Sequence, residues 1–182
     1  MSQLSESIEK VSLQVTKEFS DKITSPWILV DSTSQSMFVI DGQSLLHKYP
    51  VSTSRYGMGC KQDSFQTPVG AHKIAKKIGS EGKIDEIFTG RVATGQCASI
   101  VSEKKSSGLD LILTRILWLQ GLEANINCGE GVDSFERYIY IHGTHEEGLL
   151  GVPASHGCVR MANADVVELF DSVDENTFVY IY

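Results

Sequence analysis

The 182-residue sequence lacks the basic clusters and long apolar runs that would indicate a nucleic-acid or membrane protein. It has 16 Lys and Arg against 23 Asp and Glu, which gives a formal net charge of −7. Binding to nucleic acid requires clustered positive charge, and no such cluster offsets this balance. No apolar run approaches the roughly 18 residues needed to span a bilayer. With 41% hydrophobic and 21% charged residues, the composition is that of a globular protein.

The N-terminus lacks the features of a secretory signal, which needs a basic start and an uninterrupted apolar core. Apolar residues instead recur at steps of three and four, which predicts an amphipathic helix over residues 1–22, before a single domain over residues 23–182. If the printed N-terminus is native, we expect a cytoplasmic protein. Removal of a signal would instead place it in the periplasm or the cell wall. The apolar stripe consists of Leu4, Ile8, Val11, Val15 and Phe19.

The four cysteines lack the close spacing of a metal site, since no CxxC pair is present. An even number could form two disulfides, but a cytosolic protein keeps its thiols reduced, so we expect free thiols. A lone cysteine usually acts as a small buried hydrophobic residue. That interpretation applies by default to Cys60, Cys97 and Cys128.

Period-two alternation and turn signals predict a mainly β fold. Three strands are expected over residues 27–30, 36–40 and 45–51, with a hairpin turn at Asp41–Gly42. Later runs rich in branched and aromatic residues predict further strands. Many short strands with few helices indicate one domain, a β-sandwich or partly closed barrel. These runs are "LILTRILWLQ", "RYIYIH" and "TFVYIY", and a further strand-like run follows Pro68 and Gly70 in "TPVGAHKIAKK".

Two further segments carry specific expectations. The Gly-rich residues 79–99 are weakly periodic and are expected to form a long loop over a site. A helix is expected to begin at Asn163 as its N-cap, with Asp165 in its first turn. The residues expected on its buried face are Val166, Val167, Leu169 and Phe170.

The stretch "GVPASHGCVRMANAD", residues 151–165, places a cysteine next to a histidine and an arginine. A cysteine is nucleophilic only as thiolate, which requires a nearby base or positive field. In an extended segment His156 and Cys158 would share a face, which makes His156 a candidate base. Gly157 keeps the backbone open, so nearby amides could approach an oxyanion. Arg160 offers a fork suited to a carboxylate, and the pattern therefore suits acyl transfer.

Other interpretations stay open on spacing alone. Arg160 could be a plain surface charge or could bind a carbonyl near the following helix. Zinc is disfavoured because no CxxC or His-Glu-x-x-His spacing is present. His47 and His72 are expected to be surface or satisfied core residues. The side chains that could otherwise hold zinc are His142, His145, His156 and Cys158.

The segment "YIHGTHEEGLLGVPASHGCVRMANADVVELF" resembles the active-site signature of the L,D-transpeptidase catalytic domain, the YkuD-like family. That signature has a His-Gly pair, a short loop, and then Ser-His-Gly-Cys followed by an apolar residue and arginine. The early hairpins and "TPVGAHKI" also resemble the family, so the likeness covers about residues 27–182. It accounts for neither the N-terminal helix nor residues 79–99.

The resemblance implies that Cys158 is the nucleophile and that His142, oriented by the carbonyl of Gly143, is the general base. This revises the assignment of His156 as base, and it implies no metal and no cofactor. Amides of residues 156–158 would form the oxyanion hole. Those amides belong to His156, Gly157 and Cys158, and the side chain of His156 is implied to be structural or to face the substrate. Ser155 and Arg160 are implied to support the substrate or the site.

Members of the family cleave the bond between the L-centre of meso-diaminopimelate and the next D-alanine in peptidoglycan stem tetrapeptides. An amine acceptor then gives a 3-3 cross-link or a lipoprotein attachment, whereas water gives L,D-carboxypeptidase activity. A cytosolic member would meet soluble stem peptides or muropeptides, so we expect a carboxypeptidase of cell-wall recycling. A secreted L,D-transpeptidase is the alternative enzyme. A non-catalytic peptidoglycan-binding module is disfavoured, because it would need neither Cys158 nor His142.

Overall fold

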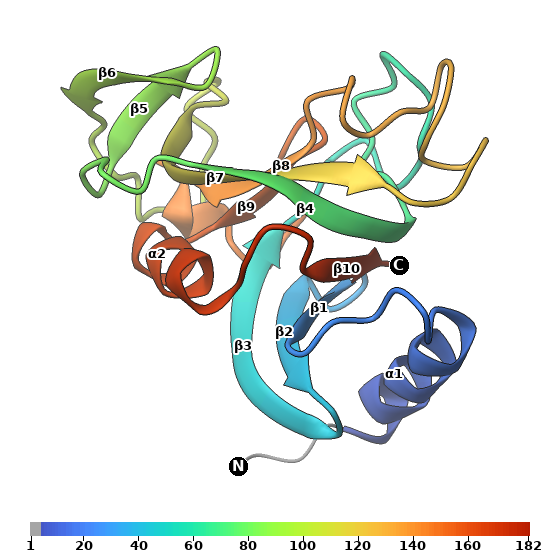
Figure 1. The fold of residues 1–182 in the computed structure, drawn as a ribbon. Helices are drawn as coiled ribbons and strands as arrows, with labels where there is room; N and C mark the ends of the chain where they lie inside the picture. The colour runs from blue at the N-terminus through green and yellow to red at the C-terminus, as the bar shows by residue number, and fades with distance from the viewer. Residues whose placement is uncertain (1–4) are drawn as a thin grey trace.

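Within residues 5–182, the part of the chain that the computed structural model describes, ten β-strands form one sheet and two helices pack against it (Figure 1). The helices are α1 (Glu6–Glu18) and α2 (Asn163–Ser172), and a 3-10 turn, η1 (Glu147–Leu149), lies between β8 and β9. The strands are β1 (Trp27–Asp31), β2 (Ser36–Asp41), β3 (Ser44–Ser52), β4 (Gly70–Ile78), β5 (Glu86–Thr89), β6 (Val92–Cys97), β7 (Ile112–Gly121), β8 (Tyr140–Gly143), β9 (Val159–Met161) and β10 (Phe178–Ile181).

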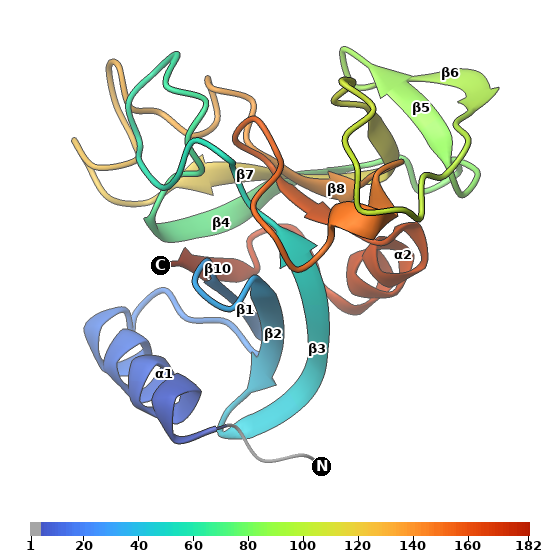
Figure 2. The same cartoon turned by 180° about the vertical axis from the view of Figure 1, so that it is seen from behind.

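The sheet closes into a barrel. Its strand order is β4-β10-β1-β2-β3-β9-β8-β7, and an additional pairing between β4 and β7 joins the two ends. Most pairs are antiparallel, but β1–β10 and β8–β9 are parallel. The predicted mainly β fold is therefore confirmed, and the barrel is the form that it takes. Figure 2 shows that β5 and β6 extend away from the barrel beside β7.

The barrel interior is the main hydrophobic core, formed by alternate residues of the strands. Leu117, Ile141 and Val159, on three neighbouring strands, are fully buried in it. The intervening residues of β7 and β8 face outward, where Trp118 and Tyr140 form a separate aromatic cluster. This alternation follows from the two-residue period of a strand, and it fixes which side chains reach the outer face.

Helix α2 packs against the barrel core through Val166, Leu169 and Phe170. The predicted N-cap is wrong by one position, because Ala162 is the N-cap and Asn163 is the first helical residue. The Asn163 amide instead donates to Glu147 Oε1 at 2.8 Å, which satisfies a donor of the first turn.

Residues 79–99 were expected to be a loop, and that expectation is wrong. They contain the β5–β6 hairpin, which pairs with β7 through β5. Its two turn residues, Gly90 and Arg91, both have positive φ (54° and 68°), as a type I′ turn requires. All residues of β6 are exposed, so the strand carries none of the apolar alternation that would predict it.

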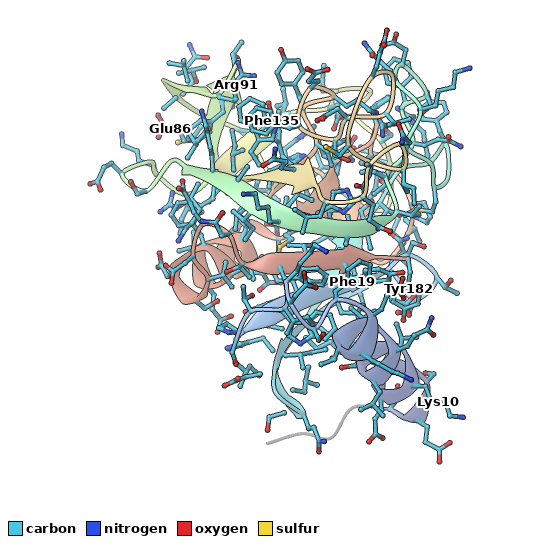
Figure 3. The ribbon with its side chains drawn as sticks, turned by 45° about the vertical axis from the view of Figure 1, so that its right-hand side comes forward. Lys10, Phe19, Glu86, Arg91, Phe135 and Tyr182 are labelled. Carbon is cyan, nitrogen blue, oxygen red and sulfur yellow. The ribbon has the colours of Figure 1, made fainter. Side chains whose placement is uncertain are left out.

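Helix α1 packs on the outside of the barrel against β1, β2 and β10, with Ile8 and Val15 buried in the contact. Phe19 follows the helix and meets Phe178 and Tyr180, with ring centroids 5.6 and 5.8 Å apart. In Figure 3 its ring points toward β10. The helix is shorter than the predicted 1–22, and the predicted Leu4 lies outside the described residues. No helix within residues 5–182 is both long and apolar enough to cross a membrane.

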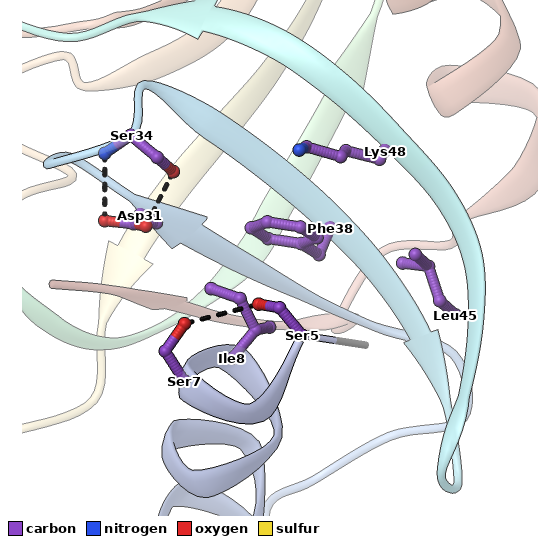
Figure 4. Close-up of a pocket in the computed structure, with 8 residues that line it drawn as sticks. All are labelled: Ser5, Ser7, Ile8, Asp31, Ser34, Phe38, Leu45 and Lys48. Carbon is purple, nitrogen blue, oxygen red and sulfur yellow. Dashed lines mark hydrogen bonds between the residues drawn. The ribbon is translucent and has the colours of Figure 1, made fainter. Parts of the chain in front are cut away.

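A hollow of about 280 Å³ separates the first turn of α1 from strands β1–β3 (Figure 4). Asp31 borders it and accepts hydrogen bonds from the Thr33 and Ser34 amides and from Ser34 Oγ. These bonds stabilise the tight turn between β1 and β2, which is the structural role of an aspartate at a turn.

We predict that Phe19→Ala lowers the free energy of unfolding by about 3 kcal/mol, because it removes a buried ring from the contact between α1 and β10. Leu13→Ala is the matched control, since Leu13 is 54% exposed on α1, the helix that Phe19 follows, and should shift stability by less than about 0.5 kcal/mol. Urea unfolding measures both. Equal small effects would show that Phe19 contributes no core packing.

Candidate active site

His142 and Cys158 lie on the same outer face of the barrel. Strands β8 and β9 are parallel, with Ile141 opposite Val159 and His142 opposite Arg160. Opposed residues share a face, and so do residues two apart on one strand. Because Ile141 and Val159 face the core, His142, Arg160 and Cys158 project to the other side. The outward position of the thiol is supported by the Tyr140 amide, which donates to Cys158 Sγ at 3.4 Å.

His142 is only 1% exposed, and its tautomer follows from one hydrogen bond. Its Nδ1 lies 2.7 Å from the carbonyl oxygen of Gly143, which can only accept, so Nδ1 carries the proton. Burial lowers the pKa of His142 to about 4, against opposing contributions from Asp110 and the Gly143 carbonyl. The imidazole is therefore neutral at physiological pH, with a lone pair on Nε2 that can accept a proton.

Gly143 is required by close packing against Asn163. A Cβ at position 143 would collide with Asn163 Oδ1. That side chain cannot yield easily, because its Nδ2 donates to Thr144 O and Glu147 Oε1, both at 2.8 Å. Its Oδ1 accepts from Thr114 Oγ1 at 2.7 Å. The absence of a side chain at Gly143 thus allows the carbonyl that orients His142 to sit against the start of α2.

Residues 155–158, here called the cysteine loop, are shaped by Ser155. Its buried Oγ donates to the Cys158 carbonyl at 2.6 Å and accepts from the Gly157 amide at 3.2 Å. Gly157 has φ +128°, a conformation that other residues rarely adopt. The Ser155 amide donates to Thr53 O at 3.0 Å, which ties the loop to the end of β3. Since Ser155 already engages the Gly157 amide, the Cys158 amide is the better placed donor for an oxyanion.

The Cys158 thiol is held in its neutral form. Burial raises the pKa of Cys158 to about 12; the Tyr140 amide, Arg160 and Arg137 oppose that shift, and Asp110 adds to it. The thiol is directed at the Tyr138 carbonyl, 3.5 Å from Sγ. The resting pair is therefore a neutral thiol and a neutral imidazole. Such a pair reacts only when the base removes the thiol proton during attack.

Arg160 is 1% exposed and binds two carboxylates of the protein itself. Its Nη1 donates to Glu146 Oε2 at 2.8 Å, while Nη2 and Nε donate to Asp110 Oδ1 at 2.5 and 3.1 Å. The sequence suggested that this fork reads a substrate carboxylate. In the structure it holds Asp110 and Glu146 together instead, because a buried guanidinium requires paired carboxylates.

These carboxylates also hold residues 101–110, here called the strap, over the cysteine loop. Glu146 accepts hydrogen bonds from the hydroxyls of Ser106 and Ser107, and the Ser107 amide also donates to it. His145 Nε2 lies 2.7 Å from Ser107 Oγ. The sequence alone does not identify Asp110 and Glu146 as site residues, because nothing in its pattern tells which of 23 acidic residues neutralises Arg160.

His156 has both ring nitrogens engaged. Nδ1 donates to Asp110 Oδ2 at 2.8 Å, and Nε2 accepts from Arg55 Nη2. Its ring also lies near Tyr56 and Phe65, with centroids 5.8 and 6.3 Å away. A ring nitrogen that already accepts a hydrogen bond is a poor base, so the geometry favours His142 for that role.

The remaining histidines and cysteines have simpler environments. His72 is fully buried with both nitrogens paired, to Gly70 O at 2.9 Å and Ser134 Oγ at 3.0 Å. His47 stacks on Tyr49 near the surface. These are the satisfied-core and surface roles expected from the sequence. All four cysteines are free thiols, and residues 5–182 contain no group of three His, Cys, Asp or Glu side chains arranged for a metal ion.

The chain matches the L,D-transpeptidase catalytic domain family model over residues 25–181, and it therefore belongs to that family. This match confirms the resemblance noted in the sequence. Comparison with curated proteins finds no match.

Solved L,D-transpeptidases share the fold. One from Mycobacterium smegmatis is 14% identical, with a TM-score of 0.53 over 86% of this chain and 58% of its own. One from Xylanimonas cellulosilytica is 19% identical, with a TM-score of 0.54 over 88% of this chain and 61% of its own. L,D-transpeptidase 3 from Mycobacterium tuberculosis, solved with a faropenem-derived adduct, is 15% identical, with a TM-score of 0.53 over 86% and 60%. This chain thus spans about three fifths of the length of these structures.

The neutral thiol–imidazole pair predicts a specific pH dependence. As the pH rises through about 4, His142 loses its proton and becomes the base, so kcat/KM should rise there and then stay level through neutral pH. Steady-state rates between pH 3.5 and 9 test this, with circular dichroism at each pH to confirm folding. An acid limb near 6.5 would instead show that burial does not lower the pKa of His142. Loss of activity at alkaline pH, where an imidazolium would deprotonate, would indicate a thiolate–imidazolium pair.

Arg160→Ala should destabilise the protein by about 3–5 kcal/mol, because it leaves two carboxylates without their buried partner. Activity should fall for a peptide acid and its C-terminal amide alike. Lys104→Ala removes an exposed charge from the strap and is the control. An Arg160→Ala variant that keeps its Tm, yet no longer distinguishes the peptide acid from its C-terminal amide, would indicate that Arg160 binds the carboxylate of the substrate.

Proposed function

We propose that this protein is a cysteine acyl-transfer enzyme that cleaves the L,D bond between meso-diaminopimelate and D-alanine in peptidoglycan tetrapeptides, with water as the final acceptor. The observation that carries the proposal is the common outer face of His142 and Cys158, combined with the unprotonated Nε2 of His142. Membership of the L,D-transpeptidase family supplies the bond type.

The proposed reaction has two steps. His142 Nε2 takes the Cys158 proton as Sγ attacks the carbonyl carbon of the L-centre, and the Cys158 amide donates to the oxyanion. The intermediate collapses as His142 returns the proton to the departing amino group of D-alanine, which leaves a thioester on Sγ. Water then attacks the thioester while His142 accepts its proton. Release of the tripeptide carboxylate restores the thiol.

Water is the acceptor that we expect for a protein acting on soluble stem peptides or muropeptides in the cytoplasm. An exported enzyme, in the periplasm or the cell wall, would instead meet amine acceptors and form 3-3 cross-links. The solved relatives are named L,D-transpeptidases, which keeps that alternative in view.

A non-catalytic peptidoglycan-binding module fits the structure less well. Binding alone requires neither a thiol on the outer face nor a buried histidine whose Nε2 is kept unprotonated.

The proposal predicts that Cys158→Ala abolishes turnover while the fold persists. His142→Ala should lose about 10²–10⁴-fold in acylation rate, since a positioned base contributes that much. His156→Ala should lose less. Cys97→Ala, which changes an exposed cysteine, is the control and should keep its activity. Mass spectrometry of tetrapeptide and disaccharide tetrapeptide digests follows the products.

The products also separate the candidate functions. Tripeptide and free D-alanine, with one oxygen taken from ¹⁸O-labelled water, indicate hydrolysis. Cross-linked dimers in the presence of a second stem peptide indicate transpeptidation. Undiminished turnover by Cys158→Ala would exclude the acyl-enzyme mechanism.

A further inference from the structure

A cleft of about 220 Å³ lies directly beside the cysteine loop. Its walls come from residues 62, 63 and 65, from residues 136–139 before β8, and from His156. Two contacts place it next to the thiol. Cys158 Sγ is directed at the carbonyl of Tyr138, and the Cα of Gly157 faces Ile139. A group held in this cleft would therefore be close to an acyl group on Cys158.

The cleft carries both signs of charge. Arg137 lines it, with Nη2 donating to Gln66 O at 2.6 Å and Nη1 to Gly59 O at 3.3 Å. These bonds fix the guanidinium plane, and within residues 5–182 its Nε–H has no protein acceptor. Asp63 and Glu136 line the same cleft, and both are exposed. A fixed fork beside free carboxylates suits a ligand with one carboxylate and one ammonium.

The backbone of the cleft supports a binding role. Asp63, Phe65 and Tyr138 all adopt left-handed conformations, with φ between 57° and 60°. For bulky residues such as Phe and Tyr this conformation is uncommon and carries an energetic cost. Costs of this kind persist mainly at ligand sites, where the surrounding structure enforces them. The two rings are also about half exposed (56% and 52%), as a wall for the apolar part of a ligand would be.

We propose that this cleft holds the distal end of the third-residue side chain of the donor stem peptide, an amino acid group with one carboxylate and one ammonium. Arg137 binds the carboxylate, and Asp63 and Glu136 bind the ammonium. Phe65 and Tyr138 flank the methylene chain. The inference rests on the proposed function, and it makes Arg137 the residue that selects a diamino diacid over lysine at this position.

Calorimetric binding to Cys158→Ala tests the cleft without turnover. The ligands are the meso-diaminopimelate tetrapeptide and three analogues: one with the distal carboxylate amidated, one with the distal amine acetylated, and one with L-lysine as third residue. The unmodified peptide should bind at least about 10-fold more tightly than each analogue, since a charge-assisted hydrogen bond contributes that much.

A second substitution in Cys158→Ala identifies the residue that binds each charged group of the peptide. Arg137→Gln should remove the preference for the free carboxylate, and Glu136→Gln should reduce the preference for the free amine. Lys61→Gln makes the same change in charge as Arg137→Gln at an exposed neighbour outside the cleft lining, so it should keep both preferences. If Arg137→Gln fails to fold, Glu136→Gln still tests the cleft through the preference for the free amine. Glu136 is exposed, so its substitution should leave the fold intact.

Binding and cleavage are read separately. Equal binding of all four peptides would overturn the cleft assignment, even if the wild-type enzyme cleaves every one of them. Retained discrimination without any cleavage would instead overturn the proposed function and leave the cleft as a binding site. The wild-type acyl-enzyme could instead discriminate among the four peptides only when they are added as a second, acceptor peptide. That result would place the acceptor in the cleft and would also overturn the donor assignment.

Discussion

The ion cluster of buried Arg160 and Glu146 with partly exposed Asp110 is the interaction on which the site depends. A guanidinium that is 1% exposed is stable only with carboxylates around it, and removal of Arg160 would leave the buried carboxylate of Glu146 unpaired at a cost of about 3–5 kcal/mol. Its members come from the strap, from the segment after β8 and from β9. The cluster thus joins three segments that are distant in sequence at one position on the barrel.

The same cluster shapes the electrostatics around Cys158 and His142. Asp110 binds His156 as well as Arg160, so it fixes one side of the cysteine loop. Ser155 fixes the other side through the Cys158 carbonyl. Between them the thiol and His142 are buried enough that both stay neutral. A neutral thiol is less reactive than a thiolate, so the proposed mechanism requires His142 to take the Cys158 proton during attack.

Features set by residues that are neighbours in sequence could be predicted, whereas contacts between residues distant in sequence could not. The strands at residues 27–51 follow from alternation and turn residues, and their boundaries agree with β1–β3 within one residue at either end. The β5–β6 hairpin was missed because β6 buries nothing, so it has no apolar period. Asp110 was missed because only the folded barrel brings it to Arg160. Likewise, the neighbour in sequence, His156, was a natural first candidate for the base, whereas pairing of β8 with β9 brings His142 to the same face as Cys158.

Selective ¹⁵N labelling of histidine, followed by NMR titration of His142, tests the central claim most directly. The account predicts that His142 stays neutral from pH 8 to about pH 5, with the proton on Nδ1, because the Gly143 carbonyl accepts from that atom and burial lowers the pKa of His142 to about 4. A ring protonated on both nitrogens at pH 7, or a neutral ring with its proton on Nε2, would contradict it.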